Sequence, residues 1–161
     1  MEAEMSPGKK AGIIYSINLS EKKGELKTPV DRAELVAGMG IKSDGHFGFK
    51  QRQVSILELE AIEKAKKELG KRDKKLAEKI SAGSFAENIT TKGIDLSLAE
   101  PGKILILAGK IRLKVSQLGK KDDPNSIVNQ TFGISLLPRV GVFCEVLDSG
   151  IIKPGDKIEW E

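Results

Sequence analysis

The sequence predicts a mainly β protein: a small closed or nearly closed β-barrel with a helical insertion of one or two helices. Three observations predict it. Glycine is frequent, at 17 of 161 residues, which indicates many turns. Several short stretches of strand-forming residues are separated by turn signals, and only one region has apolar residues at helical spacing. The length suits a single domain over residues 1–161, with residues 1–10 as a frayed, polar terminus.

Short β-forming stretches account for most of the expected strands. Residues 12–19 (GIIYSINL) combine β-branched and aromatic side chains, which suit a strand. Gly109 and Lys110 separate two runs that indicate a hairpin, residues 103–108 and 111–117, and apolar and polar residues alternate along the second run. Further strands are expected at residues 53–57, 141–147 and 156–160, with an extended segment at 33–41 and a polar connection at 21–29.

The helical insertion follows the strand expected at residues 53–57. Its first helix has four apolar residues at helical spacing and ends at Gly70. These four residues are Leu59, Ile62, Ala65 and Leu69. A second, shorter helix fits residues 73–80, and we expect the pair to pack against the sheet. No further helix is expected beyond Ser81.

The net charge of +4 permits acidic partners such as phosphorylated cofactors or nucleic acid, without demanding them. Positive charge concentrates in residues 60–79, where eight Lys or Arg accompany five Asp or Glu. Many opposite charges there lie three or four residues apart, as on a solvated helix. A nucleic-acid patch is the less favoured alternative, because none of the seven aromatic residues of the chain interleaves with this run to stack bases.

The sequence also bears on the compartment. No window approaches the ~20 uninterrupted apolar residues of a membrane span, and the first residues lack the apolar core of a secretory signal. The single cysteine excludes an internal disulfide, in agreement with a reducing environment. We therefore expect a cytoplasmic protein without membrane contact.

The segment 41–55 (IKSDGHFGFKQRQVS) holds two candidate site residues. His46, the only histidine, lies between two glycines that permit a sharp turn, and Asp44 could hold one tautomer of its ring. One histidine and one aspartate are too few ligands for a dedicated zinc site, and a structural role remains the alternative. Arg52 could reach from a strand entrance toward a phosphate or carboxylate, or could form an ion pair with Asp44 or a surface glutamate.

Two polar loops are further candidates. Residues 82–95 carry Glu87, Asn88 and two threonines between glycines, and such a loop could present polar groups to a ligand or form a buried turn in which Asn88 satisfies backbone groups. The loop GKKDDPNSIVNQ has adjacent carboxylates, Asp122 and Asp123, which could bind a cation or exchange protons. The same composition is also common in turns.

The only cysteine, Cys144, lies in a predicted strand. By the two-residue alternation it shares a face with Val142 and Val146, which is typical of an inert core thiol. An activated thiolate would need a cation or a helix N-terminus nearby, and neither is visible in the local sequence.

Taken together and in order, four segments resemble the MOSC family, the domain found at the C-terminal end of molybdenum-cofactor sulfurases and as small stand-alone bacterial proteins. The matching segments are IKSDGHFGFKQRQVSILELEAIEK, AGSFAENITTKGIDL, PGKILILAGKIRLKVSQLGK and LLPRVGVFCEVLDSGIIKPGDKI. They cover most of residues 41–158. The resemblance implies a barrel of the pyruvate-kinase-barrel type, in agreement with the expected strands.

The resemblance also implies a site and a function. A pocket would hold a pterin-type molybdenum cofactor or a related sulfur acceptor, and the protein would act in cofactor handling or sulfur delivery. The residues implied for cofactor binding are His46, Arg52, Glu87 and Asn88, with Lys120 and Arg139 as additional candidates. Proteins of molybdenum-cofactor biosynthesis or molybdoenzymes would be the partners.

The chain departs from the family pattern at the cysteines. Small bacterial members carry thiols in the loop where this chain has Asp122, Asp123 and Ser126, and another before the Met-Pro-Arg where it has Ser135. Carboxylates and hydroxyls cannot form a persulfide and are poor ligands for a soft metal. Sulfur transfer through this loop is therefore not expected, and Cys144 could replace it only if its strand presents the thiol to the same pocket.

These observations leave the catalytic role open. The leading hypothesis is a barrel that binds a molybdenum-pterin cofactor or its precursor. The alternatives are a non-catalytic interaction module on the same barrel and, less favoured, a basic nucleic-acid-binding barrel. Pyridoxal phosphate belongs to a separate transferase domain of larger family members, and no glycine-rich phosphate cup with a lysine for it is evident in this chain.

Overall fold

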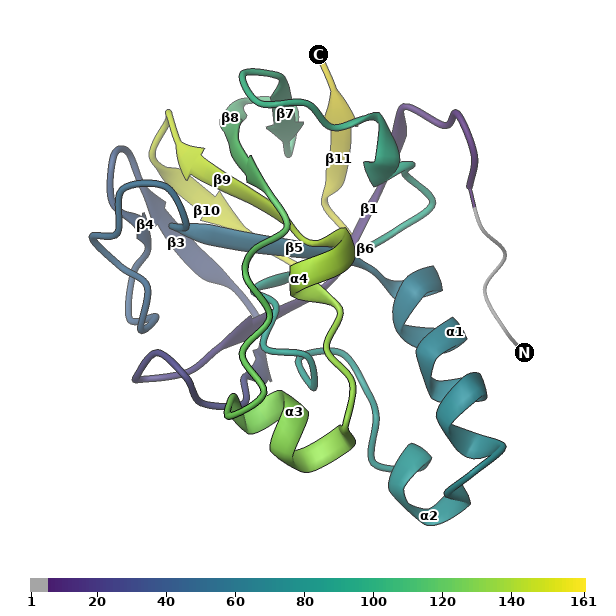
Figure 1. Cartoon of the computed structure of the whole chain (residues 1–161). Coiled ribbons are helices and arrows are strands. Elements are labelled where there is room, and N and C mark those ends of the chain that lie inside the picture. Colours follow the sequence, from purple (N-terminus) through teal and green to yellow (C-terminus); the bar gives the residue numbers. More distant parts are fainter. Residues whose placement is uncertain (1–5) are drawn as a thin grey trace.

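The computed structural model of the chain describes residues 6–161 and has a closed seven-stranded β-barrel at its centre (Figure 1). The barrel strands are β1 (Ala11–Leu19), β5 (Val54–Glu58), β6 (Ile89–Lys92), β7 (Ile104–Leu107), β8 (Ile111–Leu118), β9 (Val142–Val146) and β11 (Lys157–Trp160). Their order around the barrel is β11-β7-β8-β9-β5-β6-β1, and pairing of β1 with β11 closes it. Only the β5–β6 pair is parallel. The predicted mainly β barrel is confirmed.

Two smaller parts extend the barrel. Strand β2 (Thr28–Val30) pairs with the end of β1. A second sheet contains β3 (Ala33–Val36), β4 (Gly40–Ile41) and β10 (Gly150–Ile152), in the order β10-β3-β4. The extended segment expected at residues 33–41 is therefore a short hairpin of two strands.

The barrel interior is filled by alternate side chains of its strands. In β8, Ile111, Leu113 and Val115 are buried, whereas Arg112 and Lys114 are exposed, as the alternation predicts. Inward-facing side chains of the other barrel strands complete one apolar cluster in the interior. A second apolar cluster lies outside, between the barrel and the helices.

The predicted helical insertion between β5 and β6 is confirmed. Helix α1 (Leu59–Gly70) buries all four of the apolar residues that define its periodicity. Helix α2 (Lys74–Ala77) is shorter than the predicted 73–80, and the Asp73 carboxylate caps its start by accepting from the Leu76 N–H. Both helices lie on one side of the barrel and contribute to the outer cluster (Figure 1).

The expectation of no helix beyond Ser81 is wrong. The structure has helices α3 (Ile127–Phe132) and α4 (Leu137–Val140), and a 3₁₀ turn at Leu96–Leu98. Each is too short to show a repeating apolar pattern. Local capping defines α3 instead: Ser126 accepts from the Asn129 N–H, and Gly133 ends the helix in the left-handed conformation.

Strand β6 was also not expected, since its segment reads as a polar loop. Ile89, Thr90 and Thr91 are all buried, so no alternation marks the strand. At the other end of the chain, residues 6–10 lie along the barrel, where the Gly8 N–H donates to Asp95. The expected frayed terminus includes residues 1–5, which lie outside the described residues. Within residues 6–161 no helix has both the length and the apolar character of a membrane span.

Gly119 provides a test of how the segment after β8 is held. It has φ +64°, and a Cβ there would lie 2.5 Å from the Pro138 carbonyl oxygen; Gly109 has φ +73° but open space around it. Gly109→Ala should cost only the left-handed backbone penalty of about 1–2 kcal/mol. Gly119→Ala should cost about 1–3 kcal/mol more through overlap. Urea unfolding of both variants measures the difference, and equal losses would contradict the close approach.

Candidate functional site

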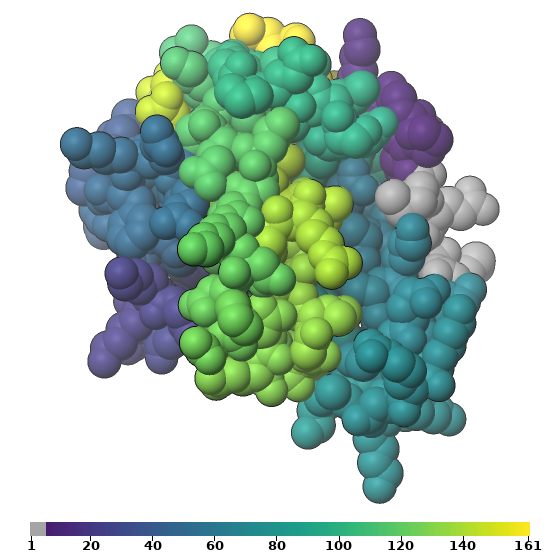
Figure 2. Space-filling view, viewed as in Figure 1, coloured from purple at the N-terminus to yellow at the C-terminus, as the bar shows by residue number. Residues whose placement is uncertain are grey.

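A pocket of about 310 Å³ opens where three distant chain segments meet over β5 and β9. One wall is the loop that contains Gly24 and Glu25, another carries His46 and Arg52, and the third is the segment from Lys120 to Pro138. In the space-filling view this third segment, in green, lies across the front of the molecule beside the purple and blue loops (Figure 2). The pocket therefore forms only when these three segments come together in the folded chain.

Two cations, Arg52 and Lys120, line the pocket, and neither forms an ion pair with another described residue. Within residues 6–161 the Arg52 guanidinium shows no ion pair, so the ion pair considered for it with Asp44 does not form. Burial lowers the pKa of the Lys120 ammonium, and the charge of Arg52 lowers it further, whereas Asp122 and Asp123 act in the opposite direction. The lowered pKa thus reflects burial first and the charge of Arg52 second, and an anion bound beside Lys120 would favour its charged form.

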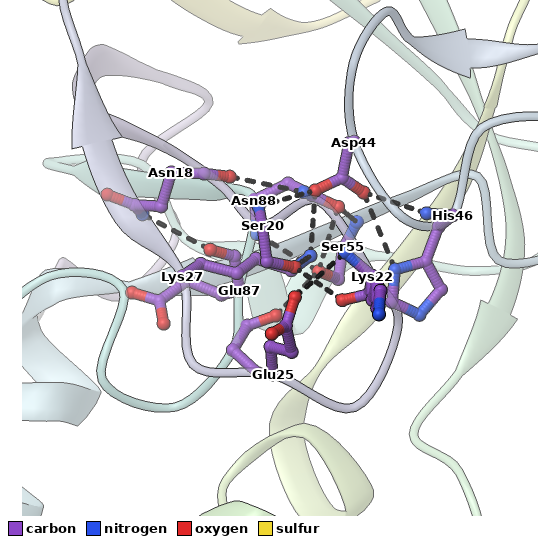
Figure 3. A network of polar contacts seen from close by, with 11 residues as sticks. Asn18, Ser20, Lys22, Glu25, Lys27, Asp44, His46, Ser55, Glu87 and Asn88 are labelled. Carbon is purple, nitrogen blue, oxygen red and sulfur yellow. Dashed lines mark hydrogen bonds and ion pairs between the residues drawn. The ribbon is translucent and has the colours of Figure 1, made fainter.

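A buried ion pair beside the pocket joins two of its walls (Figure 3). The Lys27 ammonium lies 2.8 Å from Asp44 Oδ1, and these side chains are 1% and 0% exposed. The same ammonium donates to Ser20 Oγ. Burial by itself would raise the pKa of Asp44, but hydrogen bonds from His46 and Lys27, together with the Lys27 charge, hold it well below its usual range.

His46 lines the pocket. Its backbone N–H donates to Asp44 Oδ2, and its ring Nδ1 lies 3.4 Å from the same oxygen. Gly45 is required here because a Cβ would overlap the backbone of Lys22, so the two loops touch. The ring also meets Phe49 edge-on, with 5.0 Å between ring centroids.

The structure does not bring Glu87 and Asn88 to the pocket surface. Asn88 is buried: its Oδ1 accepts from the N–H and hydroxyl of Ser55, and its Nδ2 donates to the Asn18 carbonyl. This is the buried-turn alternative for Asn88. It acts on the site indirectly, because Ser55 does line the pocket.

Glu87 is fully buried in the same polar network. Its carboxylate accepts from the N–H groups of Gly83 and Phe85 and from the Thr90 hydroxyl. Burial raises the pKa of Glu87 against the effect of these hydrogen bonds. Its hydrogen bonds to the backbone of Gly83 and Phe85 hold this loop in place, and Phe85 itself lines the pocket.

Arg139 is separated from the other candidates. It lines a different depression of about 440 Å³, together with Glu58 and Val140. The polypeptide around Gly119 and Pro138 lies between the two concavities, since Lys120 and Pro138 face the first and Gly119 and Arg139 face the second. Sequence reasoning could not predict that the neighbouring residues Pro138 and Arg139 line different concavities.

The loop in which the resemblance places the missing cysteines does reach the pocket. Its lining residues include Asp122, Asp123, Ser126 and Ser135. Asp122 accepts from the Asn129 side chain, and Ser126 caps α3, so part of their hydrogen-bonding capacity holds the loop itself. No group of three or more His, Cys, Asp or Glu residues able to hold a metal ion occurs in residues 6–161.

Cys144 faces away from the pocket. Phe143 lines the pocket, and because successive side chains of a strand point to opposite faces, Cys144 points into the barrel interior. The thiol is 0% exposed, and burial, with a smaller effect of Glu145, raises its pKa well above the usual range. It has the surroundings of the inert core thiol that the alternation indicates.

Sequence reasoning missed Lys27 and Ser55. Lys27 lies in a lysine-rich polar connection, where nothing distinguishes a buried lysine from its exposed neighbours Lys22 and Lys23. Ser55 could have been found, because it is a polar residue between Val54 and Ile56 and, by strand alternation, faces away from these two core residues.

The buried pair predicts a pH-dependent loss of stability in Asp44→Asn. The variant leaves the Lys27 ammonium buried without a counter-charge, at a cost of about 3–5 kcal/mol. Because folding lowers the pKa of Asp44, the advantage of the wild type should be complete above pH ~4 and be lost as the pH falls further. Urea unfolding between acidic and neutral pH measures it.

A matched control is Glu68→Gln, which removes the exposed ion pair of Glu68 with Lys71 and should change stability little at any pH. A constant difference between wild type and Asp44→Asn down to strongly acidic pH would contradict the assigned role of the carboxylate.

Comparison with known proteins agrees with this architecture. The sequence model of the MOSC domain matches residues 42–159. The YuaD protein from Bacillus subtilis has a TM-score of 0.72 at 20% identity, covering 93% of this chain and 95% of that chain. YiiM from Geobacillus stearothermophilus has a TM-score of 0.65 at 21% identity, covering 94% and 75%.

YiiM from Escherichia coli has a TM-score of 0.62 at 20% identity, covering 94% of this chain and 68% of that chain. At such identities the likeness to these structures shows the fold alone. No curated protein matches the sequence. Because the domain model spans well over half of the residues, the chain belongs to the MOSC domain family.

Proposed function

We propose that the pocket binds an anionic heterocycle, a molybdenum-pterin cofactor or its precursor, and that the protein takes part in handling this molecule. The observation that carries the proposal is the division of charge in one concavity. Arg52, Lys120 and His46 line it together with three carboxylates, Glu25, Asp122 and Asp123. A ligand with an anionic end and a hydrogen-bond-donating end suits such a lining.

The cationic residues suit a phosphate group. Arg52 can donate two parallel hydrogen bonds to it, and Lys120 adds a compact point charge. Because burial and Arg52 lower the pKa of Lys120, a bound anion stabilises its charged form. The interaction is therefore stronger than that of an exposed lysine with the same anion.

The remaining lining residues suit the ring system. Phe85, Val128 and Phe143 offer apolar surface to a flat heterocycle, and Asp122 or Asp123 can accept from the amino and N–H groups of a pterin. The volume of about 310 Å³ lies at the lower end of the range for small-molecule pockets. It suits a pterin with a short phosphate-bearing side chain.

The residues present do not suit sulfur chemistry on the protein. A thiolate is the natural ligand of a soft metal and the group that forms a persulfide, and the only thiol of the chain is buried in the barrel. Asp122, Asp123, Ser126 and Ser135 supply hard oxygen ligands instead. The proposed role is therefore to hold or transfer the intact cofactor or precursor.

A non-catalytic binding module is the second candidate, and the burial of Cys144 favours it. In this case a protein of molybdenum-cofactor biosynthesis, or a molybdoenzyme, would supply or receive the ligand. Both candidates share the binding step, so the same experiment tests them first.

Binding of pterin-6-carboxylate, a fluorescent anionic pterin, tests the pocket. Arg52→Met and Lys120→Met should each weaken binding about tenfold or more, because each removes a charged hydrogen bond. Arg139→Met is the matched control: it removes a cation from the other depression and should leave the affinity unchanged. Fluorescence titration measures all three, and equal losses in Arg52→Met and Arg139→Met would contradict the assigned pocket.

The absence of protein-based sulfur transfer can be tested on Cys144. The native protein should react very slowly with a thiol-specific reagent such as a disulfide dye, and the unfolded protein should release one equivalent at once. Mass spectrometry of the native protein should find no persulfide on Cys144. Rapid labelling of the folded protein, or a persulfide on this thiol, would overturn this part of the proposal.

A further inference from the structure

Both oxygens of the Asp44 carboxylate accept hydrogen bonds from other described residues. Its Oδ1 accepts from the Lys27 ammonium at 2.8 Å and from the Ser20 N–H at 3.2 Å. Its Oδ2 accepts from the His46 N–H at 3.1 Å and lies 3.4 Å from His46 Nδ1. Figure 3 shows these contacts, with the imidazole turned so that one ring nitrogen faces Asp44 and the other points away.

This arrangement determines which ring nitrogen carries the proton when His46 is neutral. Lys27 keeps the carboxylate ionised, and an ionised carboxylate accepts hydrogen bonds but cannot donate one. Nδ1 is buried and forms no hydrogen bond within residues 6–161, and the Asp44 carboxylate lies 3.4 Å from it. A proton on Nδ1 is attracted to Asp44, whereas a lone pair there would face a negative charge.

The other nitrogen, Nε2, is then left as an acceptor. The His46 side chain is 25% exposed, and since Nδ1 is buried, the exposed part is the side of the ring away from Asp44, which lines the pocket. The two cations of the same pocket, Arg52 and Lys120, only donate hydrogen bonds. His46 thus adds an acceptor next to two donors.

We propose that His46 is a specificity-determining residue: Asp44 fixes its proton on Nδ1, and Nε2 accepts a hydrogen bond from the ligand. The pocket then prefers an anionic group that has its own O–H, or an N–H beside it, over an anion of the same charge and shape without one. This inference rests on the proposed function, because it describes ligand selection at the same pocket. Asp44 is the positioning residue for the ring.

Hydrogen phosphate and sulfate provide a direct test. Both are tetrahedral dianions, but only hydrogen phosphate has a proton to donate to Nε2. At pH ~8, calorimetry should give about tenfold tighter binding of hydrogen phosphate, as expected for one hydrogen bond gained. Equal affinities would overturn the inference.

Two variants separate His46 from the general attraction of the pocket for anions. His46→Phe should remove the preference, so that both ions bind with similar affinity. Arg52→Met should weaken both ions and leave their ratio unchanged, because the guanidinium donates equally to either. A preference that survives in His46→Phe would assign the selectivity to another group and overturn the inference.

Nitrogen chemical shifts of the imidazole give an independent reading. His46 is the only histidine, so the ring signals of the labelled protein belong to it alone. We expect the proton on Nδ1 in the free protein, and a proton on Nε2 would overturn the inference. If neither ion binds at all, the anion-binding pocket itself is wrong and the proposed function fails with it. Binding of both ions without preference would leave the proposed function standing.

Discussion

The buried ion pair of Lys27 with Asp44 is the interaction on which the candidate site depends. A buried charge is tolerated only when it is paired and hydrogen-bonded, so neither group can leave the other without a large loss of free energy. The pair joins two loops that are distant in sequence, and the contact of Gly45 with the Lys22 backbone keeps them in register. His46 is held at the pocket because its own N–H is part of this network.

The barrel supplies the second constraint through the alternation of its strands. In β5, Val54 and Ile56 fill the interior, and Ser55 between them faces the pocket. In β9, Phe143 faces the pocket and Cys144 the interior. The same rule that builds the core therefore decides which side chains the site can use, and it excludes the only thiol. Asn88 helps to hold Ser55 in this position, because its Oδ1 accepts hydrogen bonds from the backbone N–H and the hydroxyl of Ser55.

The pocket combines an inherited scaffold with a lining of its own. The MOSC match covers residues 42–159, a range that includes His46 and Arg52, and both of these residues line the pocket. The segment after β8 crosses the pocket and presents carboxylates and hydroxyls to it. Such a lining favours recognition of charge and hydrogen-bond donors over soft-metal chemistry. This lining, together with the burial of Cys144, is why the proposed function concerns the binding of a cofactor or precursor, with no covalent step on the protein.

The sequence by itself determined the barrel, the helical insertion and the inward direction of Cys144, because alternation and helical periodicity are local patterns. It also indicated His46 and Arg52, which stand out beside glycines and a strand. Only the tertiary structure decided that Lys27 is buried against Asp44, that Asn88 and Glu87 lie beneath the pocket, and that Arg139 faces another depression. Burial and pairing of polar groups depend on which distant segments meet, and the short helices α3 and α4 depend on local capping and packing rather than on a repeating pattern.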